Sequence, residues 1–451
     1  MGADIIVAPD ALNSARHLRD YCVEAEPQVR ILALAYPRHT QQVCAILRYC
    51  NERGIPVQPQ GGLTGLSGGG VPLFPCVVVS LERMRAIREL DTAAGTITVE
   101  AGIAMEAVQQ AADAAELFFP LDLGGRGSCQ IGGNISTNAG GNRVLRFGMA
   151  RDLVLGVEAV LPDGTLIDAL RKFIKNNAGY DLRQLFIGTE GTLGIVTAAV
   201  LRLFPKPRSI CTGICAVDDY AGALALLSRA RAGFGSQLTA FEVMWPEFYE
   251  VGTVRLGRAP PLERGHGLYV LVETMGTDSE ADQERYETVM GAALEQGIVR
   301  DASIAKSQRE TTDLWSVRDS PGEWQRAGHW PQLSFDVSVS TGEIGELVGE
   351  IRAALRARWP ALSALYFGHV ADGNLHVSVL MAGHSVAALA IEEAIYALVS
   401  RRRGSISAEH GIGSLKKEFL PLSRSPAEIA LMRTLKRAID PNGILNPGKI
   451  F

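Results

Sequence analysis

Short apolar runs alternate with amphipathic segments through the first half of the chain. VRILALAYP, from Val29 to Pro37, has the length and composition of a strand. The next segment, TQQVCAILRYCNERG, repeats apolar residues at helical spacing from Val43 to Cys50, with Thr40 as the expected N-cap and Gly54 as the C-cap. Further strands are predicted at GIPV, CVVVSL and GTITVEAG, and a helix at MEAVQQAADAAELF. This alternation predicts an α/β first half.

The pattern changes after Pro205 and Pro207, which mark a domain boundary. Longer amphipathic helices such as DDYAGALALLSRARAGF and GELVGEIRAALRARW alternate with strands such as GLYVLVET and LSFDVSVS. This order predicts an antiparallel sheet with helices on one face. A last helix, PAEIALMRTLKRAI, precedes the tail ILNPGKIF.

The length of 451 residues exceeds what one core usually supports, so at least two domains are expected. With 44 basic and 49 acidic side chains, charge gives no reason to expect nucleic acid as a partner. The seven cysteines are odd in number and form no C-x-x-C pair, which favours reduced thiols in a cytoplasmic protein. No signal peptide or membrane-spanning run is predicted, while peripheral membrane contact stays open.

The segment QPQGGLTGLSGGGVP, from Gln58 to Pro72, contains six glycines between two predicted strands. Glycine lets a ligand approach the backbone, so we favour a phosphate-binding loop over a flexible linker. No G-x-G-x-x-G lies on the loop, and GILNPGKI near the C-terminus matches a P-loop only by accident. A second glycine-rich stretch spans Leu121 to Gly148, and a hairpin is expected around Pro162-Asp163-Gly164.

Candidate metal ligands occur in YFGHVADGNLHVSV, where two apolar runs flank an Asp-Gly pair. A two-residue turn at Asp372-Gly373 would place His369 directly opposite His376, close enough to share a metal ion. The alternative is two ordinary histidines. Glu409 and His410 lie in a predicted loop, where the carboxylate would complete a two-histidine, one-carboxylate set and the histidine would act as a base.

Together these motifs resemble the FAD-linked oxidases of the vanillyl-alcohol oxidase and p-cresol methylhydroxylase superfamily, and most closely its D-2-hydroxy acid dehydrogenase branch. That branch includes FAD-linked D-lactate and D-2-hydroxyglutarate dehydrogenases and the glycolate oxidase flavin subunit. The resemblance implies an α+β protein with a two-subdomain FAD-binding domain over residues 1–207. A substrate (cap) domain with the metal site would follow over 208–410, and residues 411–451 would return to the FAD domain.

The resemblance also implies which residues bind FAD. PQGGLTGLSGG would cradle the diphosphate with backbone amides, without a Rossmann fold or a lysine. The segment contains no histidine that could attach the flavin covalently, so non-covalent FAD is expected. DLGGRGSCQIGGNISTNAGG would line the flavin, and GTEGTLGIVT the adenosine side. The candidate FAD ligands are Pro59, Gly61, Gly62, Leu63, Thr64, Gly65, Gly124, Ser128, Gly132, Gly133, Thr137, Asn138, Gly191, Ile195, Val196 and Asn446.

By the same resemblance, His369, His376 and Glu409 are the metal ligands, with Zn²⁺ the expected ion. The metal would bind the substrate and lower the pKa of its hydroxyl group, His410 would take the proton, and hydride would pass to flavin N5, leaving a 2-oxo acid. Arg318, in LWSVRDSPGEW, would pair with the substrate carboxylate.

Three positions depart from the dicarboxylate-oxidising relatives. Gly322 replaces a threonine, Ser334 a lysine and Ser378 an asparagine. The first two changes argue for a monocarboxylate such as D-lactate rather than D-2-hydroxyglutarate. Trp324 and Trp330 are candidates for a more apolar pocket, or for the core.

Three alternatives remain at this stage: D-2-hydroxyglutarate oxidation, a flavin subunit of a glycolate-oxidase-type complex, and a flavin-binding protein without turnover. The expected partners are a 2-hydroxy acid and an electron acceptor, which would be a quinone, a cytochrome or an electron-transfer flavoprotein. The oligomeric state is not specified, and a homodimer is one alternative.

Overall fold

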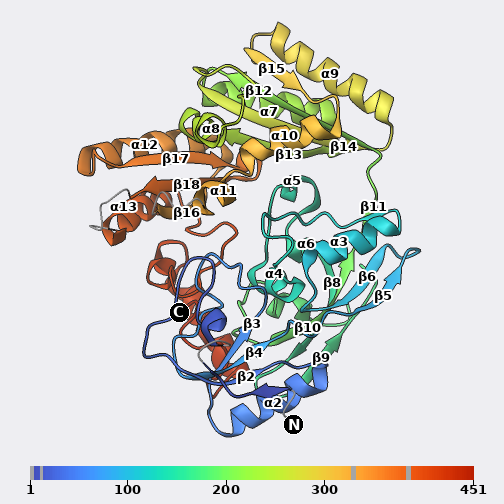
Figure 1. Cartoon of the computed structure of the whole chain (residues 1–451), viewed down its shortest axis with the longest axis vertical. Coiled ribbons are helices and arrows are strands. Elements are labelled where there is room, and N and C mark those ends of the chain that lie inside the picture. The colour runs from blue at the N-terminus through green and yellow to red at the C-terminus, as the bar shows by residue number, and fades with distance from the viewer. Residues whose placement is uncertain (1–4, 11–13, 327–331, 382–387) are drawn as a thin grey trace. The chain divides into compact units, whose positions relative to one another are not determined.

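The computed structural model describes residues 5–10, 14–326, 332–381 and 388–451 (Figure 1). The chain forms two compact units. Unit 1 contains Met1–Gly141, Gly148–Lys206 and Glu409–Phe451, and unit 2 contains Asn142–Phe147 and Pro207–Ala408. The chain thus leaves unit 1 for the short segment Asn142–Phe147, which the sequence did not reveal, and returns to it after Ala408.

Unit 1 begins with a four-stranded sheet in the order β1-β2-β4-β3. Strands β2, β4 and β3 are parallel, and β1 pairs with β2 in the antiparallel direction. The bounds are β1 (Ile6–Val7), β2 (Ile31–Ala35), β3 (Val57–Gln60) and β4 (Cys76–Ser80). Parallel strands need a crossover connection, and helix α2 (Thr40–Glu52) forms the one from β2 to β3, which lie on either side of β4.

Helix α2 buries the apolar face that the sequence predicts, but its N-cap is His39 rather than Thr40. Thr40 is the first helical residue, and its buried hydroxyl donates to Glu158 Oε1 at 2.6 Å. Arg53 is the C-cap, and Gly54 follows with φ of 60°. The threonine was assigned to the wrong role because its partner lies on a distant strand.

The second sheet of unit 1 is antiparallel, in the order β5-β6-β10-β8-β9. Its strands are β5 (Ile87–Asp91), β6 (Thr96–Glu100), β8 (Val154–Val160), β9 (Leu166–Ala169) and β10 (Ile195–Arg202). Strands β8 and β9 form the hairpin predicted around Pro162-Asp163-Gly164. A small pair joins β7 (Leu117–Phe118) to β11 (Phe204–Pro205), and the helices are α3 (Met105–Ala114), α4 (Ile131–Thr137), α6 (Ala150–Leu153) and α14 (Pro426–Ile439).

The C-terminal tail packs beside β3, where Val57 N donates to Ile444 O at 2.8 Å and Asn446 N donates to Val57 O at 2.9 Å. It follows α14, which starts with a capping box of Ser425 and Glu428. The last segment is therefore an integral part of unit 1.

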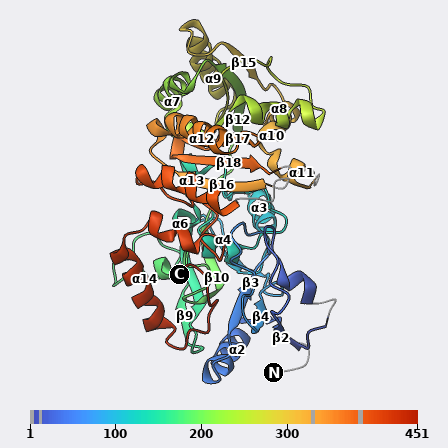
Figure 2. The same ribbon diagram turned by 90° about the vertical axis from the view of Figure 1, so that its left-hand side faces the viewer.

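Unit 2 is built on a seven-stranded antiparallel sheet in the order β15-β12-β14-β13-β17-β18-β16. The strands are β12 (Ser209–Val217), β13 (Leu238–Met244), β14 (Leu268–Gly276), β15 (Asp301–Ile304), β16 (Gln332–Ser338), β17 (Ser363–Gly368) and β18 (Asn374–Leu380). The helices are α5 (Val144–Phe147), α7 (Tyr220–Phe234), α8 (Pro246–Gly252), α9 (Ser279–Glu295), α10 (Gln308–Arg318), α11 (Pro321–Arg326), α12 (Ile344–Arg358) and α13 (Ala388–Arg401). Helices α12 and α13 pack against each other (Figure 2).

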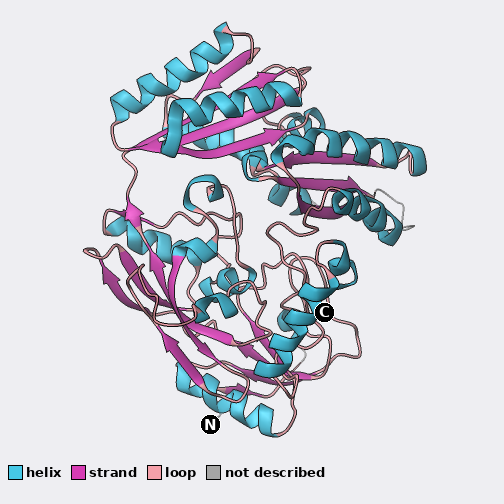
Figure 3. Cartoon of the chain, turned by 180° about the vertical axis from the view of Figure 1, so that it is seen from behind, coloured by secondary structure: helices cyan, strands magenta, loops and turns pink. Residues whose placement is uncertain are grey.

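Helices cover both faces of this sheet, although we expected them on one face only (Figure 3). A Cβ on Gly213 of β12 would meet Tyr286 of α9, whereas the next residue, Ile214, belongs to a core that includes Phe248 of α8 and Leu314 of α10. Because successive strand residues point to opposite faces, the buried run of β12 requires cover on both sides.

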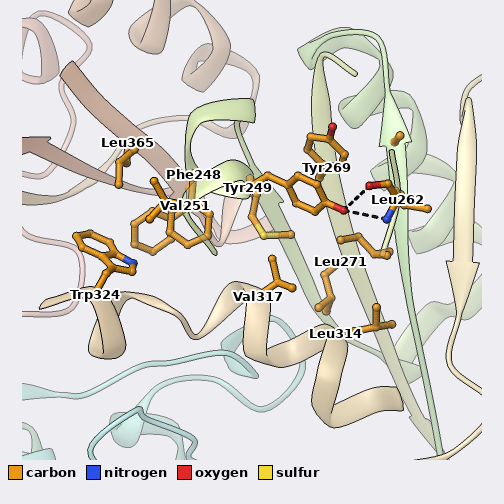
Figure 4. Close-up of a cluster of buried hydrophobic side chains, with 14 of the residues drawn as sticks. Phe248, Tyr249, Val251, Leu262, Tyr269, Leu271, Leu314, Val317, Trp324 and Leu365 are labelled. Atoms are coloured by element: carbon orange, nitrogen blue, oxygen red, sulfur yellow. Dashed lines mark hydrogen bonds between the residues drawn. The ribbon is translucent and has the colours of Figure 1, made fainter. Parts of the chain in front are cut away.

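The core on the α8 and α10 side is dense in aromatic side chains (Figure 4). The rings of Tyr249 and Tyr269 stack with centroids 3.6 Å apart, and the Tyr249 hydroxyl bonds both the amide and the carbonyl of Leu262 at 2.9 Å. Trp324 is 3% exposed in the same core, so it packs as a core residue. Trp330 lies outside the described residues.

All seven cysteines are free thiols in the structure, and five of them are buried. A search of the described residues finds no helix that is both long enough and apolar enough to cross a membrane.

Candidate active site

The glycine loop after β3 presents a run of backbone amides. Within the part of the chain that the structure describes, the amides of residues 61–66 donate to no protein acceptor. Leu63 has φ of 56°, and a Cβ on Gly62 would lie 1.9 Å from Ser128 O. Consecutive free amides around a left-handed residue form the concave anion site that phosphates occupy. These residues therefore fit a diphosphate.

The structure brings the other predicted FAD ligands to this loop from three segments of unit 1. Thr64 lies 3.5 Å from the Cβ position of Gly125, and a Cβ on Gly191 would lie 2.7 Å from Pro59 Cγ. Asn446 donates to Glu190 O at 2.7 Å, and its buried Oδ1 has no partner among the described residues. This oxygen is available to a ligand donor.

Several predicted ligands have structural partners within unit 1. The Thr137 hydroxyl donates to Gly133 O at 3.1 Å, and Asn138, in the left-handed region, accepts from Arg151 N at 2.9 Å. Ile195 and Val196 are buried in β10, where they pair with β8. A Cβ on Gly132 would lie 2.8 Å from Ala101 Cβ, whereas Gly124 has open space around its Cβ position.

A lysine that we did not predict lies behind the glycine loop. Lys449 is 2% exposed, and its Nζ donates to Gly68 O at 2.9 Å and Val71 O at 2.6 Å. Burial lowers the pKa of Lys449 to about 8, although the charges of Glu190 and Asp20 raise it. Lys449 therefore places a buried cation against carbonyl groups of the glycine loop.

The turn that begins with Glu409 and His410 is built on the same loop. The Ser67 hydroxyl donates to His410 O at 3.0 Å, and Gly141 N donates to Glu409 Oε1 at 2.5 Å. Buried Glu190 accepts from the amides of Ile412 and Gly413, both at 2.8 Å. Burial raises the pKa of Glu190, while these amides lower it. Glu190 thus fastens the turn that carries the predicted base.

In unit 2 the histidine hairpin has a different register from the predicted one. His376 faces Phe367, not His369. The connection contains a short 3₁₀ turn, Val370–Asp372, and His369 precedes it outside the strand. His369 O accepts from the amides of Asp372 and Asn374, which makes the loop wider than a two-residue turn. The two imidazole rings still lie together, with centroids 5.4 Å apart.

A buried carboxylate, Glu242 of β13, connects His369 to Arg318. Its Oε1 lies 2.6 Å from His369 Nδ1, and its Oε2 accepts from Arg318 Nε at 2.7 Å. Arg318 Nη2 lies 3.2 Å from His369 Nε2. Burial alone would raise the pKa of Glu242, but the charge of Arg318 and the hydrogen bonds from His369 and Arg318 lower it below its usual value. The carboxylate is therefore ionised at neutral pH.

The second histidine has its own acidic neighbour. His376 faces Asp336 of β16, with Nδ1 3.7 Å from Oδ1, and Asn374 Nδ2 donates to the same oxygen at 2.8 Å. Ala408 N donates to Asp336 O at 3.1 Å. The chain therefore passes this strand immediately before the peptide bond that leads to Glu409.

The predicted site residues belong to both units. Unit 2 brings together Arg318, His369 and His376, whereas Glu409 and His410 open the last segment of unit 1. Glu242 and Asp336 were not predicted from the sequence. A charged residue within a continuous apolar strand, as in LTAFEVM and SFDVS, was the signal that could have identified both.

The donor set of unit 2 fits a divalent metal. A histidine that gives its Nδ1 proton to a carboxylate keeps the lone pair on Nε2, and metal-binding histidines are commonly oriented this way. Arg318 Nη2 lies 3.2 Å from His369 Nε2, so a carboxylate held at this histidine would have a cation next to it.

The three substrate-related departures lie on three elements, β16, β18 and α11. Ser334 is exposed on β16 and pairs with the buried Ser378 on β18. This pair lies two residues along the strands from the pair of Asp336 and His376. Gly322 is in α11. None of these side chains carries a positive charge.

Two family models match the chain, "FAD binding domain" over residues 31–170 and "FAD linked oxidases, C-terminal domain" over residues 206–450. Mitochondrial D-2-hydroxyglutarate dehydrogenase of Bos taurus is 40% identical, over 93% of this chain and 76% of that protein. A putative mitochondrial D-lactate dehydrogenase of Schizosaccharomyces pombe is 39% identical, over 92% and 80%. D-2-hydroxyglutarate dehydrogenase of Stutzerimonas stutzeri is 36% identical, over 93% and 90%.

Solved structures agree with the expected fold. A crystal structure of p-cresol methylhydroxylase with bound substrate has a TM-score of 0.82 at 17% identity, covering 100% of this chain and 94% of that one. Alkyldihydroxyacetonephosphate synthase has a TM-score of 0.76 at 15% identity, covering 99% and 82%. The FAD-binding fold is therefore of the p-cresol methylhydroxylase type. With its own FAD-binding and oxidase domains and these relatives over nine-tenths of its length, the chain belongs to the family of FAD-linked D-2-hydroxy acid dehydrogenases.

Proposed function

We propose that the protein oxidises a D-2-hydroxy acid to the 2-oxo acid with non-covalently bound FAD and a divalent metal, and that it favours monocarboxylates such as D-lactate. The observation that carries the proposal is the group of Arg318, His369 and His376 in unit 2, in which the first two side chains are buried and His376 is half-buried. In a chain with an FAD-binding domain, this group combines a carboxylate-binding fork with two metal-ligating imidazoles.

Each residue has a distinct task in this proposal. Arg318 holds the carboxylate next to the reacting carbon, because Glu242 fixes the plane of its guanidinium through Nε. His369, His376 and Glu409 hold the metal, and His410 accepts the hydroxyl proton. When bound, the flavin accepts the hydride and the metal polarises the hydroxyl.

Non-covalent binding follows from the residues around the glycine loop. Residues 61–65 contain no histidine or cysteine, and Cys129 is buried with its Sγ 3.6 Å from Asn134 Nδ2. Burial raises the pKa of Cys129, which keeps it a thiol. Heat or acid denaturation should release the yellow flavin into the supernatant. Flavin that stays with the precipitate would contradict this part of the proposal.

The monocarboxylate preference rests on Gly322 and Ser334, which offer no partner to a second substrate carboxylate. Burying an unpaired carboxylate costs several kcal/mol, enough to reject a ligand. D-2-hydroxyglutarate is the second candidate substrate, because two of the three relatives above carry its name.

Anaerobic reduction of the bound flavin distinguishes these substrates. Enantiopure lactate, 2-hydroxyglutarate, malate, glycolate and mandelate would be compared by kcat/KM. We expect D-lactate to exceed D-2-hydroxyglutarate, and Ser334→Lys to shift the preference toward the dicarboxylate. A wild-type enzyme that prefers D-2-hydroxyglutarate would support the second candidate, and no flavin reduction by any 2-hydroxy acid would overturn both. Cytoplasmic location, the electron acceptor and a homodimer remain predictions from the sequence.

A further inference from the structure

Glu242 is a buried acid at the centre of the unit 2 sheet. It is 1% exposed, and it faces Leu271 on β14, a member of the aromatic core shown in Figure 4. An ionised carboxylate in such surroundings destabilises a fold by several kcal/mol unless it is fully paired. A residue retained at such a cost needs a reason beyond packing.

Both oxygens of Glu242 are used, each by a residue of the proposed active site. Oε2 accepts from Arg318 Nε at the end of α10, and Oε1 contacts His369 Nδ1 in the loop after β17. The Phe367 ring supports this arrangement, since the Arg318 guanidinium lies 4.9 Å from its centroid and the His376 ring lies at the same centroid distance. One carboxylate thus connects two separate elements.

The contacts determine the tautomer of His369. A guanidinium is only a donor, so Nε2, 3.2 Å from Arg318 Nη2, must be the acceptor nitrogen of a neutral ring. The proton is then on Nδ1, where Glu242 accepts it at 2.6 Å. The Nε2 lone pair then points away from Glu242 and toward Arg318 Nη2, so a metal that bound at Nε2 would take the place of this Arg318 contact.

We propose that Glu242 is a positioning residue that holds His369 in its metal-binding tautomer and Arg318 in its carboxylate-binding plane. The roles of those two partners rest on the proposed function, whereas the positioning by Glu242 can be measured without turnover. Glu242 touches neither substrate nor metal in this proposal and acts only through its two neighbours.

A glutamine at this position shows why the carboxylate is required. Arg318 Nε–H and His369 Nδ1–H are both donors, but a side-chain amide offers only one acceptor atom. If His369 changed to the other neutral tautomer, its Nδ1 could accept a hydrogen bond from the glutamine amide. The proton on Nε2 would then face the Arg318 Nη2–H donor. Glu242→Gln therefore cannot satisfy all three groups, and one of the two active-site residues must lose its orientation.

The test uses the full-length, FAD-loaded protein, stripped of metal by a chelator and titrated with Zn²⁺ by calorimetry. We expect Glu242→Gln to weaken Zn²⁺ binding by about 10–100-fold, as loss of a metal ligand's hydrogen-bond partner typically does. The matched control is Glu273→Gln on the neighbouring strand. Glu273 is equally buried and pairs with Arg143 and Trp315 rather than with His369 or Arg318. The control should keep Zn²⁺ affinity within about threefold of wild type, well below the change expected from loss of such a partner.

If Glu242→Gln does not fold, the tautomer of His369 in the wild-type protein tests the proposal instead. Long-range ¹H–¹⁵N spectra of histidine-labelled wild type, assigned by the signals lost in His369→Gln, report which ring nitrogen carries the proton. We expect a proton on Nδ1 and none on Nε2. The reverse tautomer, or a folded Glu242→Gln with wild-type Zn²⁺ affinity, would overturn the role of Glu242. Wild type that binds no Zn²⁺ or reduces no flavin would instead overturn the proposed function, and the tautomer would still decide the role of Glu242.

Discussion

At the scale of single residues, the candidate site in unit 2 contains buried charged side chains, and each of them needs a partner of opposite charge. Arg318 is 6% exposed, and its charge is balanced by Glu242. Ion pairs of this kind contribute little net stability over an apolar pair, but removing one partner is costly because the other stays buried and uncompensated. The function of Arg318 and the stability of unit 2 are therefore linked.

Arg318→Met should destabilise the protein by about 3–5 kcal/mol, because Glu242 keeps its charge without its partner. Urea unfolding followed by tryptophan fluorescence measures this. The control is Arg300→Met, which removes an exposed pair with Asp218 whose side chains are 51% and 59% exposed. It should shift the urea midpoint far less than Arg318→Met does, because exposed ion pairs contribute little to stability. Equal effects of the two substitutions would contradict the argument.

Lys449 gives a prediction about pH. Its folded pKa of about 8 lies below the usual 10.5, so between these values the unfolded chain holds a proton that the folded chain has lost. The contribution of Lys449 to the free energy of unfolding therefore rises with pH between about 8 and 10.5. The positive charge behind the glycine loop is lost in the same window, and FAD affinity should fall as pH rises through about 8.

Fluorescence titration of the deflavinated protein with FAD, from pH 7 to pH 10, measures this effect. Besides Glu190 and Asp20, the ionisable groups around Lys449 are Lys417 and Cys76. Lys449→Met should bind FAD more weakly at pH 7 and lose the pH dependence. Lys436→Met, which removes a half-buried lysine bonded to Thr192 O and Leu445 O, should keep it. A flat wild-type profile would refute the role of Lys449.

At the scale of elements, the histidine hairpin shows what a local pattern can predict. The Asp-Gly pair indicated a two-residue turn, but a 3₁₀ turn places Gly373 at φ of 91° and moves the register by two residues. A shift of two leaves every side chain on its predicted face. The two histidines therefore came together as expected, although the predicted pairing was wrong.

Glu242 could not be assigned in the same way. Its partners Arg318 and His369 lie 76 and 127 residues further along the chain, and β13 is buried on both faces, so it shows no alternation of polar and apolar residues. Strands and helices follow from local periodicity, whereas the order of strands in a sheet decides which distant side chains meet. The FAD loop was predictable because one continuous segment forms it.

Gly373→Ala tests how firmly the hairpin is specified. A Cβ there would adopt a left-handed conformation and lie 2.7 Å from Val339 O, so we expect a loss of at least about 1–2 kcal/mol, with weaker Zn²⁺ binding. Gly349→Ala, in α12 with open space around its Cβ position, should instead stabilise by about 0.5–1 kcal/mol. Chemical unfolding and Zn²⁺ titration of both variants measure this, and a neutral Gly373→Ala would show that the loop tolerates another conformation.

At the scale of the whole molecule, the predicted FAD ligands and the two proposed metal-binding histidines lie in different units. Every predicted FAD ligand lies in unit 1, and the histidine pair lies in unit 2. All five tryptophans of the chain also fall within Pro207–Ala408. Flavin absorbance therefore reports on unit 1, and tryptophan emission reports on unit 2, without any added label.

Gly62→Ala and His376→Ala should consequently fail in opposite ways. A Cβ on Gly62 would lie 1.9 Å from Ser128 O, and since this is backbone, the loop must move. We expect Gly62→Ala to lose FAD while its tryptophan-monitored urea midpoint matches that of deflavinated wild type. His376→Ala should keep wild-type FAD content but lose Zn²⁺ binding and flavin reduction. If Gly62→Ala shifted the tryptophan transition, or His376→Ala released FAD, the units would not be separate in stability, and the flavin and tryptophan signals would not report on them independently.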